Sequence, residues 1–174
     1  MSRQPSDEEF SEFVQVAWPG LVRTAYLLLG DRGLAEDLAQ TALAKTYAAW
    51  PKVRDVRAAP GYARTTLVNT AASWFRRRSW RNELPTGSLP DRGPVDDLDP
   101  SLRPAVLEAL GQLPPRQRAV IVLRFYEDLS VAETARTLGC GEGTVKSQTS
   151  HALGKLRVLL GDSVIPETSG ANHD

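Results

Sequence analysis

The chain has 174 residues and a formal net charge of zero, from 21 Lys and Arg against 21 Asp and Glu, and its length allows one ordinary domain or two small ones. One cysteine and two histidines are too few for a disulfide framework or a four-ligand zinc site, so we expect neither a metal nor a cofactor. No apolar run approaches the roughly 20 residues of a membrane helix, and the acidic amino end does not resemble a signal peptide. We therefore expect a soluble, cytoplasmic protein without membrane insertion.

The zero net charge hides a strong segregation of charge along the chain. Residues 51–82 carry eight Lys and Arg against one acid, residues 83–108 carry two against six, and residues 109–160 carry seven against four. A protein that binds a polyanion at two places would show this pattern, because binding depends on local potential rather than on total charge. Solvated helix faces without a partner are the alternative.

Three helices are predicted in the first 81 residues. The first begins at a capping box of Ser6 and Glu9, and Gly30 ends it. Its apolar residues recur at steps of three and four, and we expect a kink at Pro19. Asp31 can cap the second helix, which runs to a proline, and the third has a proline in its first turn and continues into a basic cluster.

The next segment looks like a linker. Residues 82–101 hold four prolines, two glycines and five acids with few apolar residues. We therefore predict a first domain at 1–81, a linker at 82–102, a second domain at 103–160 and a disordered tail at 161–174. Four helices are expected in the second domain, at about 103–112, 115–127, 130–138 and 142–160. No convincing strand appears, so the predicted fold is all-α, with two small helical domains.

Residues 131–150 fit a helix-turn-helix, in which two short helices meet at a steep angle. Ala135 allows the close contact between the helices, and Gly139 supplies a turn where a positive φ is easily reached. Leu138, Cys140 and Val145 are expected to fill the small core, so Cys140 is interpreted as a small buried residue. An unrelated helical hairpin is the alternative.

The same segment contains "GCGEGTVKS", residues 139–147, where glycines precede a Lys-Ser pair as in a phosphate-binding loop. That loop requires G-x-x-x-x-G-K-[ST], because the second glycine lets the backbone fold tightly around the phosphate. Val145 stands before Lys146 and Cys140 stands five positions earlier, so both required glycines are missing. No His, Asp and Ser arrangement suggests catalysis either, and an enzyme acting on nucleotides or nucleic acid is disfavoured.

The last predicted helix has an inward and an outward face. A step of about 100° per residue places five side chains inward: Val145, Thr149, Ala152, Leu156 and Leu159. The opposite face consists of Ser147, Ser150, His151 and Gly154, flanked by Lys146 and Gln148. Such a small, polar face can enter a DNA major groove, and the helix start can bind a phosphate. An ordinary solvent-exposed face is the alternative.

A basic and aromatic cluster ends the first domain, in "TLVNTAASWFRRRSWR" (66–81). Its members are Trp74, Phe75, Trp80, Arg76, Arg77, Arg78 and Arg81. Aromatic faces stack on unpaired bases while arginines follow the backbone, so the cluster suits single-stranded or melting DNA better than an intact duplex. Trp74 taken alone is better explained as a core residue.

A different kind of surface is predicted on the helix "AEDLAQTALAKTYAAW" (35–50). Glu36, Asp37 and Gln40 lie on one face, and the other face is rich in alanine and leucine. The polar face is either a protein docking surface or an acidic solvated surface, and the residues alone do not decide between them.

Four motifs occur together in a characteristic order between about residues 8 and 160. They are "AEDLAQ", "VNTA" before the basic run, "LPPRQRAVIVLRFYEDLSVAETARTLGCGEGTVKS" and "ALGKLR". In combination they resemble the extracytoplasmic-function (ECF) sigma factors, group 4 of the sigma-70 family of bacterial RNA polymerase subunits. The chain looks most like short actinobacterial members of a sigma-E-like subgroup.

The resemblance implies that the first domain binds the clamp of the polymerase β′ subunit through Asp37 and Gln40, and recognises and melts the promoter −10 element. The residues implied at the −10 element are Asn69, in a pocket for a flipped-out base, with Trp74, Arg76, Arg77 and Arg78. The second domain would bind the flap of the β subunit and read the −35 element as a duplex. The residues implied there are Arg124, Thr144, Lys146, Ser147, Gln148, Ser150 and His151. An anti-sigma factor is a further implied partner, and the linker would pass through the polymerase.

Three features depart from the family pattern. Thr41 replaces an acid that relatives often carry after the docking motif. Gly141 stands where a serine often caps the recognition helix, at a cost on the order of a few tenths of a kcal/mol. Gln148 and His151 replace arginines, so we expect weaker non-specific binding to duplex DNA and a smaller salt dependence.

A free-standing helix-turn-helix transcription regulator, whose first domain senses a ligand or dimerises, is the second hypothesis. The basic and aromatic cluster distinguishes it from a sigma factor. A sensing domain has no need of a platform for single-stranded DNA, so the cluster favours the sigma factor.

Overall fold

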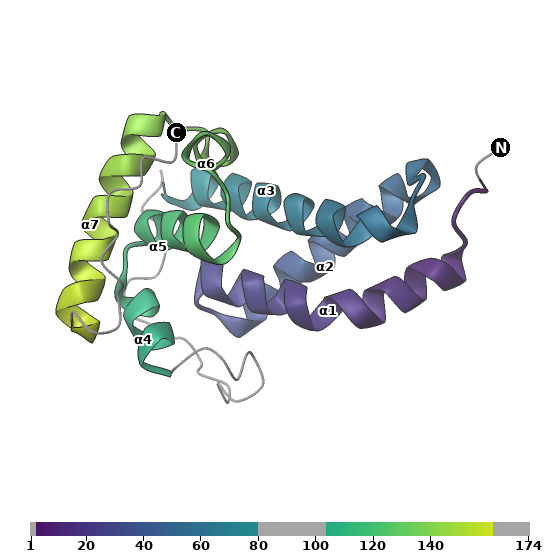
Figure 1. Ribbon diagram of the computed structural model, residues 1–174. Helices are drawn as coiled ribbons and strands as arrows, with labels where there is room; N and C mark the ends of the chain where they lie inside the picture. The colour runs from purple at the N-terminus through teal and green to yellow at the C-terminus, as the bar shows by residue number, and fades with distance from the viewer. Residues whose placement is uncertain (1–2, 80–103, 162–174) are drawn as a thin grey trace. The chain divides into compact units, whose positions relative to one another are not determined.

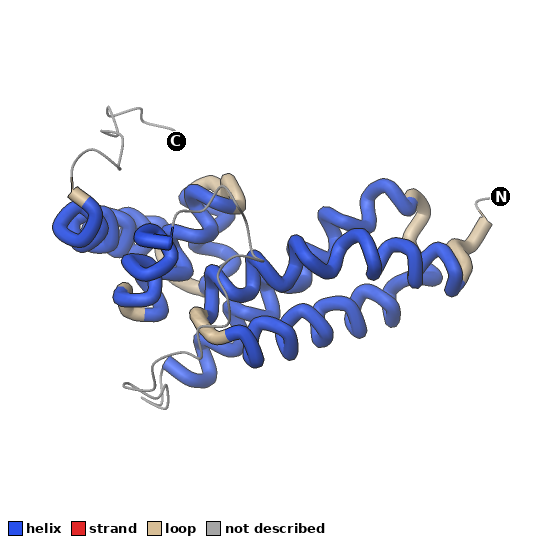
Figure 2. Tube along the Cα trace, turned by 90° about the horizontal axis from the view of Figure 1, so that it is seen from below, coloured by secondary structure: helices blue, strands red, loops and turns tan. Residues whose placement is uncertain are grey.

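The computed structural model describes residues 3–79 and 104–161 (Figures 1 and 2). Within these ranges every regular element is a helix, which confirms the all-α prediction. The described chain forms two compact units, of which the first holds α1, α2 and α3 as far as Ser73, and the second holds the end of α3 from Trp74 together with α4 to α7. The predicted linker, and the predicted tail apart from Gly161, lie outside the described residues, and the sequence-based domain boundaries stay a prediction.

The first unit begins with α1 (Asp7–Leu29) and α2 (Arg32–Ala49), which pack along each other (Figure 1). The predicted capping box is confirmed, because the Ser6 hydroxyl accepts from the Glu9 N–H at 3.2 Å and the Glu9 carboxylate accepts from the Ser6 N–H at 2.7 Å. Gly30 ends α1 with φ 70°, and the Asp31 carboxylate caps α2. The helix α1 runs on through Pro19, and the kink expected there stays a prediction.

Two short 3₁₀ segments, η1 (Trp50–Lys52) and η2 (Val56–Ala58), lead from α2 to α3 (Ala59–Ser79). The sequence did not predict them. The buried face of α3 repeats small residues, since Ala59, Ala63 and Ala71 are fully covered and Leu67 is the large side chain among them. Buried alanines lie on α2 as well.

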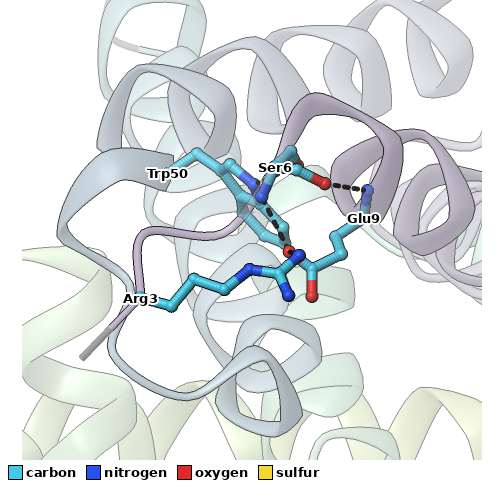
Figure 3. A network of polar contacts seen from close by, with 4 residues as sticks. All are labelled: Arg3, Ser6, Glu9 and Trp50. Atoms are coloured by element: carbon cyan, nitrogen blue, oxygen red, sulfur yellow. Dashed lines mark hydrogen bonds and ion pairs between the residues drawn. The ribbon is translucent and has the colours of Figure 1, made fainter. Parts of the chain in front are cut away.

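One tryptophan joins the start of α1 to the end of α2 (Figure 3). Trp50 is 2% exposed, and its indole N–H donates to the Ser6 carbonyl at 3.0 Å. Its ring stacks on Phe13 at 5.7 Å and meets Phe10 edge-on at 5.0 Å between centroids. The chain therefore leaves α2 at a place fixed by the first turns of α1.

The second unit consists of α4 (Pro104–Gln112), α5 (Pro115–Ile121), a π-helical segment η4 (Val122–Tyr126), α6 (Val131–Leu138) and α7 (Glu142–Leu160). The long helix α7 packs against α4, α5 and α6, and its Val145 is fully buried.

The helix predicted at 115–127 is divided, because its last turn is wider than an α-helical turn. The Glu127 N–H bonds to the Val122 carbonyl at 2.9 Å, five residues back. Asp128 follows with φ 54°. The π-helical turn therefore ends the helix without a glycine.

The end of α4 is capped by an arginine from α5. The Arg118 guanidinium donates to the carbonyls of Leu110 at 2.9 Å, Gly111 at 3.2 Å and Leu113 at 3.2 Å. The Leu110 carbonyl also accepts from the Leu113 N–H at 3.1 Å. Carbonyls at a helix end have no N–H from a following turn, so the Arg118 side chain supplies donors there.

We predict that Arg118→Ala lowers the free energy of unfolding of the second unit by about 1–2 kcal/mol, because three carbonyls lose a charged donor. Arg118→Lys keeps the charge but lacks the planar fork, so it should recover part of this loss. Urea unfolding followed by far-ultraviolet circular dichroism measures the effect, since all four tryptophans precede residue 104 and do not report on this unit. Equal stability of Arg118→Ala and the wild type would contradict the capping role.

Candidate nucleic-acid interface

The predicted helix-turn-helix is present in the second unit, formed by α6 and α7. The capping box at the start of α6 is confirmed, with the Ser130 hydroxyl accepting from the Glu133 N–H at 3.0 Å and the Glu133 carboxylate accepting from the Ser130 N–H at 2.7 Å. That last bond lowers the pKa of the Glu133 carboxyl. Gly139 ends α6 with φ 68°, as the turn requires.

Between the two helices, Ala135, Leu138 and Val145 are buried, as expected. Cys140 is a free thiol that is half-buried rather than buried, which corrects the prediction. It lies in the turn itself, where its N–H donates to the Ala135 carbonyl at 3.0 Å and its side chain is only partly covered. Gly141 begins α7 with extended backbone and no side-chain cap.

The two faces of α7 agree with the predicted division, with one exception. Val145, Ala152 and Leu156 are buried, and the Thr149 hydroxyl bonds to a carbonyl of its own helix. Leu159 was expected inward but is 42% exposed, because it lies in the last turn of α7, where the described elements cover it only in part.

The outward face of α7 has no structural role in the described unit. Lys146, Ser147, Ser150 and His151 are exposed, and Thr144 and Gln148 are half-buried at its edges. No hydrogen bond or ion pair within residues 3–79 and 104–161 engages the four exposed side chains. Their polar groups are therefore available to a molecule outside the chain.

Arg124, the seventh predicted residue of this surface, is held more firmly. Its Nη1 donates to the Leu129 carbonyl at 2.6 Å, directly before α6 begins, and its guanidinium lies 5.9 Å from the Phe125 ring centroid. Its Nε is buried without a hydrogen-bond partner among the described residues. The guanidinium is thus fixed beside the start of α6, with its second terminal nitrogen left for another acceptor.

On α3, Asn69, Arg76 and Arg77 are exposed, while Trp74 and Phe75 are half-buried. Asn69 and Arg76 are seven residues apart, which is about two helical turns, so both lie on one face of the helix. Trp74 lies on another side. The side chain of Arg78, and residues Trp80 and Arg81, are outside what the structure describes.

On α2, the two predicted docking residues Asp37 and Gln40 are exposed, on the side opposite the buried alanines and leucines. The neighbouring Glu36 is half-buried and pairs with Arg32 at 3.5 Å. The Thr41 hydroxyl donates to the Asp37 carbonyl at 2.8 Å. Thr41 therefore uses its polar group within the helix.

Two cation-bearing features were missed by the sequence analysis. The Lys45 ammonium donates to the Thr70 hydroxyl at 3.1 Å, which joins α2 to α3. Arg57 forms a two-pronged pair with Asp55 between these helices, and its hydrogen bonds lower the pKa of the Asp55 carboxyl. The residues of the first pair are 25 positions apart, so no local pattern could reveal their contact.

Within the described residues, no three His, Cys, Asp or Glu side chains are grouped as a metal site would need. The helices that the structure describes include none with the length and apolar character needed to cross a membrane.

The left-handed turn at Gly139 leads to a prediction about stability, and the nearby Gly141 offers a comparison. Gly139→Ala should cost about 1 kcal/mol of unfolding free energy, because φ 68° is a left-handed conformation that a Cβ disfavours. Gly141→Ser should instead gain on the order of a few tenths of a kcal/mol, since a hydroxyl would cap α7. Chemical unfolding followed by circular dichroism measures both, and a Gly139→Ala variant as stable as the wild type would rule out this turn.

Comparison with known protein families identifies both units. Residues 13–81 match the family described as Sigma-70 region 2, and residues 103–156 match Sigma-70, region 4. The two matches together cover α3 and the helix-turn-helix.

Individual relatives agree with these matches. The chain is 42% identical over 154 residues to the RNA polymerase sigma-E factor of Streptomyces coelicolor, covering 87% of this chain and 86% of that protein. It is 35% identical over 161 residues to the ECF RNA polymerase sigma factor SigL of Mycobacterium tuberculosis, covering 87% and 86%.

A solved structure is also similar. It is the sigma factor RpoE from Bartonella quintana in complex with the anti-sigma factor NepR, with a TM-score of 0.57 and 27% identity, covering 88% of this chain and 97% of that one. The chain therefore belongs to the extracytoplasmic-function sigma factors of the sigma-70 family.

Proposed function

We propose that this chain is an alternative sigma factor that binds core RNA polymerase, recognises the −35 and −10 promoter elements and helps to melt the DNA. The observation that carries the proposal is the pairing of two different polar surfaces in the order of sigma-70 regions 2 and 4. One is the exposed basic end of α3, and the other is the small outward face of α7. The chain would act as a non-enzymatic subunit, in the cytoplasm with the polymerase.

The outward face of α7 would read the −35 element in the major groove. Ser147, Ser150 and His151 are short enough to let the helix approach base edges, and Lys146 adds a cation at the flank. Thr144 and Gln148 would contact the DNA from the edges of this face. Arg124 would bind a phosphate with its free terminal nitrogen, because its other terminal nitrogen is fixed on the Leu129 carbonyl.

The exposed side of α3 would bind the melted −10 strand. Asn69 would contact a flipped-out base, and Arg76, Arg77 and Arg78 would follow the backbone of the strand. Trp74 is half-buried, so only part of its ring could stack on a base. Arginines suit this role because a single strand offers phosphates and base faces together.

Polymerase would dock on α2 and on the second unit. Asp37 and Gln40 would contact the clamp of the β′ subunit, and the second unit would contact the flap of the β subunit. The exposed and unpaired side chains of Asp37 and Gln40 support the first contact. We also propose an anti-sigma factor as a partner, since the similar RpoE was solved with one.

The proposed domain boundaries are 1–81 and 103–160, and the intervening residues would pass through the polymerase. A free-standing helix-turn-helix regulator is the competing function, but it does not account for the match to Sigma-70 region 2.

Transcription with purified components tests the proposal. The chain alone should bind promoter DNA weakly, and with core polymerase it should start transcripts at defined positions that share −35 and −10 sequences. Sequencing the 5′ ends of transcripts made from genomic DNA reveals these positions, with core polymerase alone as the control. Tight, specific binding by the isolated chain without any gain in transcription would instead indicate a free-standing regulator.

A further inference from the structure

Lys45 reaches from α2 to α3, where its ammonium donates to the Thr70 hydroxyl and that hydroxyl donates onward to a backbone carbonyl. Its ammonium lies 3.1 Å from the Thr70 hydroxyl oxygen, and that hydroxyl donates its proton to the Thr66 carbonyl at 2.7 Å. The oxygen of Thr70 is therefore free to accept from Lys45. Thr70 is 4% exposed, so this anchor is itself fixed in the core of the unit.

The charge of Lys45 is left uncompensated by the part of the chain that the structure describes. No carboxylate there forms an ion pair with it, unlike Arg32 and Arg57, which pair with Glu36 and Asp55. The residue is exposed, and one hydrogen bond leaves two of the three ammonium protons undirected.

The position of this ammonium matters because Thr70 directly follows Asn69. Thr70, which Lys45 contacts, faces inward, and the exposed Asn69 lies one residue earlier, a step of about 100° around α3. A base held by Asn69 would bring its own phosphates to within about the length of one nucleotide, because each phosphate is joined to the base through one sugar.

We propose that Lys45 binds a phosphate of the melted strand next to the base that Asn69 contacts, and that Thr70 is a positioning residue that aims the ammonium. This inference rests on the proposed sigma-factor function and adds a contact from α2, the helix otherwise assigned to the polymerase. The same helix would thus touch both polymerase and DNA.

The test uses polymerase holoenzyme assembled with the full chain and a promoter found by the mapping of transcript starts, premelted over its −10 element by mismatches. Lys45→Gln should reduce the slope of log Kobs against log salt by about 0.7, the value for one phosphate on a single strand, and weaken binding roughly fivefold at 0.1 M salt. Lys45→Arg should retain the slope. Thr70→Val removes the anchor but keeps the charge, so affinity should fall while the slope remains near that of the wild type.

Arg32→Gln is the matched control, because it removes a cation from the same helix where Glu36 already neutralises it, and its slope should not change. A Lys45→Gln variant with the wild-type slope overturns the proposal. If Lys45→Gln and Lys45→Arg lose the same affinity for DNA without a change of slope, Lys45 is a purely structural link, and the proposal fails as well. Thermal unfolding of each full-length variant detects a folding defect. If the wild-type chain directs no transcription, the proposed function fails instead, so the two failures are distinct.

Discussion

The indole of Trp50 is the contact on which the first unit depends. It closes the α1–α2 pair at one end, with its ring against Phe10 and Phe13 and its N–H on the Ser6 carbonyl. A buried indole without a hydrogen-bond partner would be costly, so the carbonyl at the start of α1 fixes both the position and the orientation of the ring. Because the chain turns into η1 directly at this residue, Trp50 fixes the point from which the chain runs on through η1 and η2 to α3.

The second unit likewise depends on contacts at the ends of its helices, although the contacts are different. Arg118 caps α4, the π-helical turn at Val122–Tyr126 redirects the chain, and the left-handed turn at Gly139 sets α7 against the other helices. These polar groups are used within the fold, whereas the outward side chains of α7 are not. In both units, therefore, the residues that stabilise the structure and those proposed to bind DNA are largely separate sets, so a surface substitution on α7 can alter recognition at little cost in stability.

Local signals account for what could be predicted from the sequence. Ser6 with Glu9, Asp31, Ser130 with Glu133, and Gly139 each act within a few residues of their own helix end, and the structure confirms all of them. The predicted exposure of Asp37, Gln40, Ser147 and His151 follows from helical periodicity in the same way.

Contacts between distant segments could not be predicted. The cap that Arg118 provides to α4, the bond between Lys45 and Thr70, and the partial exposure of Cys140 and Leu159 depend on how helices meet, which periodicity does not encode. The π-helical turn contains no glycine or proline that could have indicated it.

The central claim is a division of labour, in which α3 opens DNA and α7 reads the duplex. The most direct measurement compares transcription by holoenzyme on an intact promoter and on one premelted over the −10 element, for the double variants Arg76→Ala with Arg77→Ala and Ser147→Ala with His151→Ala. We predict that premelting restores transcription by the α3 variant, because the step it impairs has been bypassed. The α7 variant should stay defective on both templates, since premelting leaves the −35 duplex unchanged. Equal defects of the α3 variant on both templates, or rescue of the α7 variant by premelting, would contradict this account.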